Sequence, residues 1–173
     1  RDDGKIAWYE NTDGNGSFSS QTVITTNANG ANSVYAADLD NDGDKDVLSA
    51  SGGFNDNKIA WYENTDGNGS FSGQQVITTN ADRAASVYAA DLDNDGDKDV
   101  LSASGGFNDG KVAWYENTDG NGSFSSQTVI TTNANGANSV YAADLDNDGD
   151  KDVLSASGGF NDNKIAWYEN TDG

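Results

Sequence analysis

Three identical acidic segments are the part of this chain best suited to chemistry. Each reads Asp-Leu-Asp-Asn-Asp-Gly-Asp-Lys-Asp, and they span 38–46, 91–99 and 144–152. Carboxylates stand at positions 1, 3, 5, 7 and 9 of each segment, and the glycine at position 6 permits a sharp bend. Acidic side chains that alternate through such a bend converge on one point, where their mutual repulsion calls for a cation. The segments therefore predict sites for a hard, oxygen-preferring metal ion, and calcium fits best.

The whole sequence repeats with a period of 53 residues. The repeat units are 5–57, 58–110 and 111–163, followed by a partial fourth unit, 164–173. The first and third units differ at one position, which is Ile6 in the first and Val112 in the third. Self-similarity at this period is typical of one supersecondary unit that is stacked repeatedly. Residues 1–173 are therefore expected to form a single repeat module.

Four short runs in each unit have the alternating pattern of β-strands. In the first complete copy they are 33–38, 46–51, 58–64 and 71–79. The sequence Asp-Gly-Asn-Gly at 66–69, between the last two runs, is a strong hairpin signal. No apolar period of 3.6 residues persists along the chain, so no helix is predicted. Four strands in a unit of this length suit one blade of a β-propeller.

The predicted fold is thus all-β, a propeller-type array of four-stranded antiparallel blades. The third run occurs four times and the other three runs three times each, which gives thirteen strands and about three blades. Propellers have ~4–8 blades, so three blades cannot close a ring. Either the chain belongs to a larger ring or copies associate to complete one.

The acidic segments resemble a known calcium loop. Asp38-x-Asp40-x-Asp42-Gly43-x-x-Asp46 is similar to the loop of FG-GAP repeats, as in integrin α-subunit propellers. The following Val-Leu and the recurring Lys-Ile-Ala-Trp-Tyr-Glu-Asn resemble the bacterial VCBS branch of that family, and the similarity covers essentially the whole chain. The resemblance implies one calcium per repeat, bound by the side chains of positions 1, 3, 5 and 9 and the backbone carbonyl of position 7. The implied ligands are Asp38, Asp40, Asp42, Asp44 and Asp46 in the first loop, Asp91, Asp93, Asp95, Asp97 and Asp99 in the second, and Asp144, Asp146, Asp148, Asp150 and Asp152 in the third.

Other interpretations of these motifs are weaker. An EF-hand needs a bidentate glutamate at position 12, where this chain has Ser49 and its copies, and it needs flanking helices. The stretch 63–70 is a conceivable second metal site, but its glycines and Asx residues are what a hairpin loop requires. Trp61 is expected to pack between blades rather than to stack on a sugar, although Tyr62 or Phe54 can still be exposed.

Composition argues against several classes of function. The formal net charge of −20 repels nucleic acids and anionic membranes, and no basic patch offsets it. The lack of cysteine and histidine removes disulfides, thiol nucleophiles and the commonest general base. Acids outside the loops recur in every unit, whereas an active site is usually one asymmetric constellation. We therefore expect no catalysis, no nucleic-acid partner and no membrane insertion; no signal peptide or transmembrane run is recognisable.

The expected function is that of a calcium-binding, non-catalytic repeat module of a secreted or surface-displayed bacterial protein. Millimolar extracellular calcium would keep such sites filled. Resemblance to integrin propellers, and to fungal lectins of similar architecture, implies adhesion or recognition of a glycan or protein. Two alternatives stay open: a passive scaffold or spacer beside a catalytic domain, and a fragment or engineered propeller that closes by self-association. The chain starts and stops in mid-repeat, as a piece of a longer array would.

Overall fold

The computed structural model describes residues 3–106, 110–159 and 162–171. Units 58–110, 111–163 and 164–173 each include a few residues outside these ranges. Within the described ranges the chain has thirteen strands and no helix, as predicted. The strands are β1 (Ile6–Trp8), β2 (Thr22–Thr25), β3 (Ala31–Ala37), β4 (Asp46–Ser51), β5 (Lys58–Tyr62), β6 (Gln75–Thr78), β7 (Ala84–Ala90), β8 (Asp99–Ser104), β9 (Lys111–Tyr115), β10 (Thr128–Thr131), β11 (Ala137–Ala143), β12 (Asp152–Gly159) and β13 (Asp162–Tyr168).

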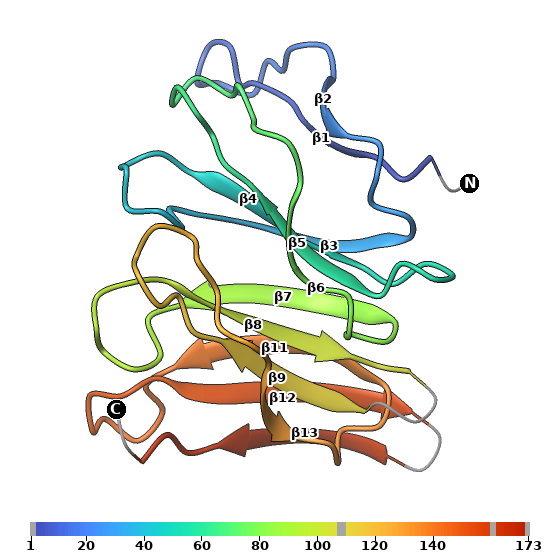
Figure 1. The fold of residues 1–173 in the computed structure, drawn as a ribbon, viewed down its shortest axis with the longest axis vertical. Helices are drawn as coiled ribbons and strands as arrows, with labels where there is room; N and C mark the ends of the chain where they lie inside the picture. The colour runs from blue at the N-terminus through green and yellow to red at the C-terminus, as the bar shows by residue number, and fades with distance from the viewer. Residues whose placement is uncertain (1–2, 107–109, 160–161, 172–173) are drawn as a thin grey trace.

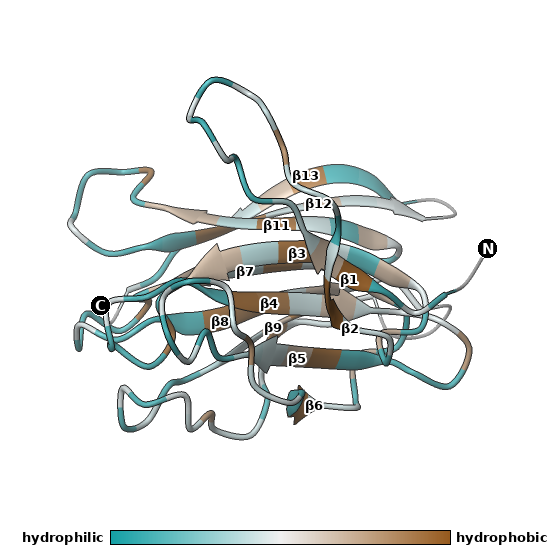
Figure 2. Ribbon diagram, turned by 90° about the horizontal axis from the view of Figure 1, so that it is seen from above, coloured by the Kyte–Doolittle hydropathy of each residue, from teal (hydrophilic) through white to brown (hydrophobic). Residues whose placement is uncertain are grey.

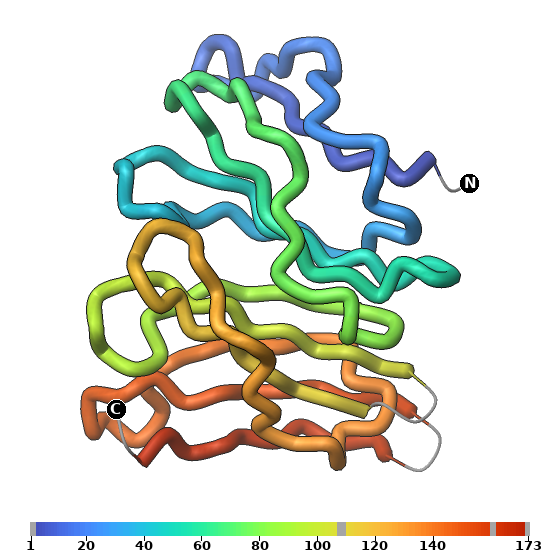
Figure 3. Tube along the Cα trace, viewed as in Figure 1, coloured from blue at the N-terminus to red at the C-terminus, as the bar shows by residue number. Residues whose placement is uncertain are grey.

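The strands form four antiparallel sheets in chain order. The first sheet is β1–β2, the second β3–β4–β5–β6, the third β7–β8–β9–β10 and the fourth β11–β12–β13. The sheets are stacked one after another, with the chain ends at opposite ends of the stack (Figures 1 and 3). The innermost strands β3, β7 and β11 contact one another along one edge. The predicted array of four-stranded antiparallel units is therefore confirmed, and the stack does not close.

Alternation along the strands decides which side chains the sheets bury. Leu48 of β4 lies opposite Tyr35 of β3 and Trp61 of β5 in the ladder. Trp61 belongs to the core between the second and third sheets, whereas its neighbour Tyr62 packs against the first sheet. The two aromatic side chains thus occupy opposite faces, as the sequence predicts. Hydrophobic segments concentrate on the central strands, and the loops at the strand ends are mostly hydrophilic (Figure 2).

The fourth strand of each unit is shorter than its sequence pattern predicts. The expected run 71–79 contains a regular strand only from Gln75 to Thr78, and Phe71 forms an isolated bridge with Asn64. The interruption has a local cause, because the Ser72 hydroxyl accepts the hydrogen bond of the Glu63 amide at 3.1 Å. The two strands of this hairpin therefore pair near the turn through Asn64 and Phe71. Regular pairing is interrupted at Ser72 and continues as the β5–β6 ladder.

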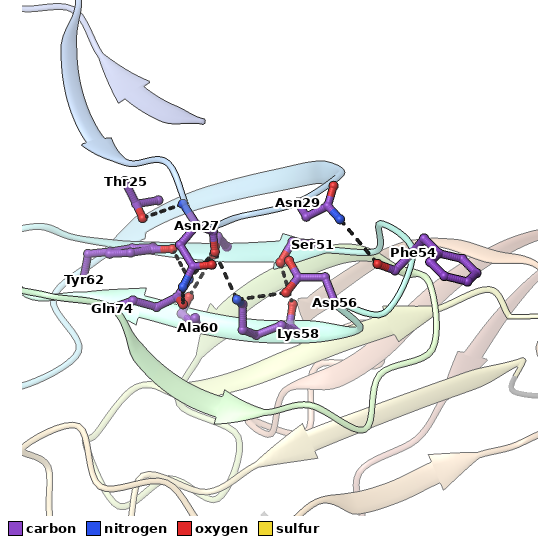
Figure 4. A network of polar contacts seen from close by, with 11 residues as sticks. Thr25, Asn27, Asn29, Ser51, Phe54, Asp56, Lys58, Ala60, Tyr62 and Gln74 are labelled. Atoms are coloured by element: carbon purple, nitrogen blue, oxygen red, sulfur yellow. Dashed lines mark hydrogen bonds and ion pairs between the residues drawn. The ribbon is translucent and has the colours of Figure 1, made fainter. Parts of the chain in front are cut away.

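A polar network around the buried Lys58 connects the first and second sheets. Lys58 Nζ forms an ion pair with Asp56 at 2.9 Å and donates a hydrogen bond to the Asn27 carbonyl at 3.0 Å (Figure 4). Gln74 Nε2 donates to the same carbonyl at 3.0 Å and to the Tyr62 hydroxyl at 2.6 Å. Because Asn27 follows β2, this network fastens the first sheet to the second.

Candidate metal centre

Each acidic loop connects the first and second strands of a sheet, so two ladder ends hold it in place. In the loop 38–46 the backbone turns sharply at Asn41 and Gly43, which have φ values of 59° and 97°. The Asp38 carboxylate accepts the Gly43 amide at 3.1 Å, and the Asp42 carboxylate accepts the Asp44 amide at 2.8 Å. The predicted bend at position 6 is present, with position 4 as a second left-handed residue.

The loops bring carboxylate oxygens together. In each loop one oxygen from each of three aspartates lies within 4.8 Å of the others. The groups are Asp38, Asp40 and Asp42, then Asp91, Asp93 and Asp99, then Asp144, Asp146 and Asp148. Three converging carboxylates supply oxygen donors of the kind that Ca²⁺ prefers.

Two carboxylate oxygens in these loops fit a bound cation particularly well. Asp38 Oδ1 and Asp91 Oδ1 are buried, and no hydrogen-bond donor reaches them within the described residues. A buried charged oxygen without a partner carries a large desolvation cost. A cation at the focus of the loop would offset that cost, so the residues present fit a metal ion.

The aspartate at position 9 is the most deeply buried of the five aspartates in each loop. The Asp46 carboxylate accepts the Leu39 amide at 2.8 Å and the Asn64 amide at 2.9 Å, and it is fully buried. Burial raises the pKa of Asp46 to about 6 and that of Asp99 to about 7, although the backbone donors oppose this effect. Asp99 is one of the three aspartates whose oxygens converge in the second loop. Asp46 is not one of the three that converge in the first loop. Asp152 is held in the same way, by the Leu145 and Asn170 amides.

Neighbouring negative charge adds to the case for a cation. Burial first, and then the charges of Asp42, Glu63 and Asp38, raise the pKa of Asp40. The pKa of Asp93 is raised in the same way, with Glu116 in the place of Glu63. The hairpin glutamate was not among the predicted site residues, because it follows its loop by some twenty positions in the sequence. The signal in the sequence was that a glutamate follows Trp-Tyr in every unit.

The aspartate at position 7 uses its side chain elsewhere. Asp97 Oδ1 accepts a hydrogen bond from Asn41 Nδ2 at 2.7 Å, and Asp150 accepts the same bond from Asn94. Asn41 also donates to the Gly120 carbonyl at 3.0 Å. Position 4 of one loop is thus joined to position 7 of the next, and sequence reasoning missed this role of the asparagines.

The stretch 63–70 forms the hairpin turn that its sequence predicts. The Asp66 carboxylate accepts hydrogen bonds from the Ser70 hydroxyl at 2.7 Å, the Asn68 amide at 2.9 Å and the Ser70 amide at 3.1 Å. These bonds, with the Ser70 hydroxyl foremost, lower the pKa of Asp66. The carboxylate is committed to the turn, which leaves little reason to assign a second metal site there.

The aromatic residues considered for sugar stacking are mostly internal. Trp61 is buried and its ring meets Phe124 edge to face, with centroids 6.4 Å apart. Tyr62 is fully buried, which excludes it from any ligand platform, while Phe54 is exposed. The predicted packing role of Trp61 is confirmed.

Comparison with known proteins identifies the family of the repeats. The profile of the FG-GAP-like repeat family matches three consecutive segments, 1–49, 46–102 and 95–155. The comparison with curated proteins gave no match. Within the described ranges no helix has the length and apolarity needed to cross a membrane. Repeats of this family are propeller-type, generally non-catalytic modules, and they occur in extracellular or surface proteins. Since the matched segments cover most of the sequence, the chain belongs to the FG-GAP-like repeat family.

Proposed function

We propose that the chain is a calcium-stabilised, non-catalytic recognition module of a secreted or surface-displayed protein. The observation that carries the calcium part is the pair of buried oxygens, Asp38 Oδ1 and Asp91 Oδ1, that lack a donor among the described residues. Each belongs to a group of three converging carboxylates. A bound Ca²⁺ would neutralise these groups and hold the bend of the loop, with one ion per repeat and about three per chain.

The role proposed for the metal is structural. The chain has 34% hydrophobic residues and a net charge of −20, a composition that gives limited apolar burial. A site that exists only in the folded state couples ion binding to folding. At a calcium concentration 100 times the dissociation constant, each site would add about 2.7 kcal/mol to the free energy of unfolding.

Calcium titration into chelator-stripped protein, followed by calorimetry, tests this proposal. We expect about three sites, together with a rise in the unfolding temperature. Asp91→Asn should weaken one site by about tenfold or more, because it replaces a converging carboxylate by a neutral amide. The matched control is Asp97→Asn in the same loop, whose side chain bonds to Asn41 and whose amide oxygen can still accept that bond. A wild-type chain that binds no calcium would contradict the proposal.

Membership of the family supports the recognition role. FG-GAP-like repeats suggest a module of surface or adhesion proteins, and we propose a glycan or protein as the ligand. Tyr35, Tyr88 and Tyr141 form a continuous row on the inner strands, with centroids 4.7 and 4.6 Å apart, and Tyr141 is exposed. Tyr35 and Tyr88 of the row line a cleft with Lys98 and Lys151, so the row offers aromatic surface beside hydrogen-bond donors.

A glycan screen in calcium-replete buffer separates recognition from a purely architectural role. Binding that Tyr141→Ala abolishes would support a ligand on the tyrosine row. Phe54→Ala is the control, since that aromatic ring is also exposed but lines a different cleft. A passive scaffold or spacer would bind nothing in either form.

A further inference from the structure

The middle repeat unit departs from the first at six positions, and three of these fall within residues 82–85. Asp82 and Arg83 replace the Asn-Gly pair that the first and third units have at 29–30 and 135–136. The exchange adds a carboxylate together with the only guanidinium group of the described residues. Two opposite charges therefore enter the chain at a place where the other units carry none.

Arg83 adopts a left-handed backbone conformation that favours glycine. Its φ is 53°, and the equivalent Gly30 and Gly136 have φ values of 63° and 69°. A residue with a Cβ is strained in this region, and asparagine and aspartate tolerate the strain best. The other non-glycine residues with positive φ in the described ranges are all asparagines. An arginine here costs stability that a glycine would not, and such strained positions cluster at binding sites.

Arg83 lines a cleft of about 450 Å³ between the second and third sheets. One wall is the hairpin between β4 and β5, from Gly52 to Asn57, and the other is formed by Asp82 and Arg83 just before β7. Both sheets have all four strands, so the cleft lies inside the stack. Its volume is within the ~300–1,000 Å³ of small-ligand pockets.

The hairpin wall supplies an aromatic ring and an amide side chain that is already bonded to the opposite wall. Phe54 is 90% exposed, the highest value among the large apolar side chains described. The Asn57 side chain accepts the backbone amide of Arg83 at 3.1 Å. The walls also approach closely at Gly52, where a Cβ would lie 2.6 Å from a carbonyl oxygen of β7. The cleft is therefore fixed in shape by contacts between its own walls.

Positive and negative charges are balanced around this cleft, although the whole chain carries a net charge of −20. The acidic loop 38–46 lies at the other end of β4, a strand of 6 residues and therefore ~20 Å long. Physiological salt screens charges at that separation, since the Debye length is ~8 Å. Nearer the cleft, Asp56 is paired with Lys58 at 2.9 Å. Asp82 and Arg83 add one charge of each sign, which favours a ligand that also carries both.

We propose that this cleft binds a zwitterionic ligand, an α-amino acid with a large apolar side chain. Arg83 would bind the carboxylate, because a guanidinium group pairs with a carboxylate through two parallel hydrogen bonds. Asp82 would accept hydrogen bonds from the ammonium group, and the Phe54 ring would cover the apolar side chain. The site shares no residue with the acidic loops or the tyrosine row, so it is a further function beside those proposed above.

The repeats supply the variants that test this site. Arg83→Gly and Asp82→Asn give the middle unit the residues that the first and third units have at these positions. Both variants should fold, because the same residues occupy the same place elsewhere in the stack. Arg83→Gly should even raise the unfolding temperature, by about 2–4 °C, because it removes the left-handed strain. Loss of ligand binding in a folded variant then reports on the site itself.

NMR titration of the full chain in calcium with free L-phenylalanine measures binding. Phenylalaninamide lacks the carboxylate and N-acetylphenylalanine lacks the ammonium group, so each should bind about tenfold more weakly. Arg83→Gly should weaken L-phenylalanine and N-acetylphenylalanine by about tenfold and leave phenylalaninamide unchanged. Asp82→Asn should weaken L-phenylalanine and phenylalaninamide and leave N-acetylphenylalanine unchanged. Phe54→Ala should weaken all three ligands, whereas Phe18→Ala, which removes an exposed ring outside the cleft, should weaken none.

Three results would overturn the proposal. The first is a folded wild-type chain that binds none of the three ligands, and the second is an Arg83→Gly protein that binds L-phenylalanine as tightly as the wild type. The third is equal affinity for N-acetylphenylalanine and L-phenylalanine, which would remove the role of Asp82 and indicate the C-terminal carboxylate of a peptide instead. None of these results would affect the calcium sites or the tyrosine row, which use other residues.

Discussion

Asn117 gives a sharp test of how the stack is held together. The side chain is fully buried, and it donates to the Leu39 carbonyl at 2.9 Å and the Lys98 carbonyl at 3.3 Å. Its own oxygen accepts the Gly122 amide at 3.2 Å. One amide therefore links the acidic loop of the previous sheet, the loop of its own sheet and the hairpin that follows it.

Replacement of Asn117 by alanine leaves these three backbone groups without that partner. A buried group that loses its hydrogen bond costs about 1–3 kcal/mol, and the Leu39 carbonyl is the most buried of the three. We expect Asn117→Ala to lower the free energy of unfolding by about 2–5 kcal/mol, a large part of the ~5–15 kcal/mol typical of a domain.

The first repeat provides a matched control. Asn11 has the same neighbours in sequence but is exposed, and among the described contacts its side chain accepts one long bond, from the Gly16 amide at 3.4 Å. Asn11→Ala should cost less than about 0.5 kcal/mol. Both variants are unfolded with urea in calcium. Equal losses for the two variants would refute the view that this amide joins the sheets.

Two further predictions concern the aromatic contact between sheets. Trp61→Ala should cost about 3–5 kcal/mol, whereas Trp167→Ala, at the exposed end of the stack, should cost less than about 1 kcal/mol, as thermal unfolding can show. Gly122→Ala should cost about 1–3 kcal/mol more than Gly16→Ala, because a Cβ at Gly122 would lie 2.3 Å from the Trp61 ring while nothing lies within 4 Å at Gly16. Both glycines have positive φ, so backbone strain largely cancels in that comparison, and equal unfolding midpoints would contradict the packing argument.

The features that sequence reasoning predicted are those encoded by near neighbours. Strand alternation, the glycine bend of the acidic loops and the hairpin turn at Asp66 depend on residues a few positions apart. The structure shows each of them, with the strand after Phe71 shorter than predicted. Opposite faces for Trp61 and Tyr62 follow from the period of a strand alone.

The contacts that sequence reasoning missed depend on how the sheets are stacked. Asn41 reaches Asp97 in the next loop, and Asn117 reaches Leu39 in the previous one. Both pairs are far apart in sequence, and their partners are known only once the order and offset of the sheets are fixed. Repetition of an asparagine at the same place in every unit was a signal, but local turn preference explains an asparagine equally well.

The acidic loops connect metal binding to the cohesion of the whole stack. The same nine residues carry the converging carboxylates, the leucine that the next sheet covers and the asparagine that bonds to the next loop. With 34% hydrophobic residues, the chain depends on these polar contacts more than a typical domain does. Repulsion among unneutralised carboxylates would act on the loop that holds Leu39 and Asn41 in place. A cation that fixes the loop therefore stabilises the contact with the following sheet as well as its own site. Because the repeats are nearly identical, each loop has the same effect on the sheet that follows it.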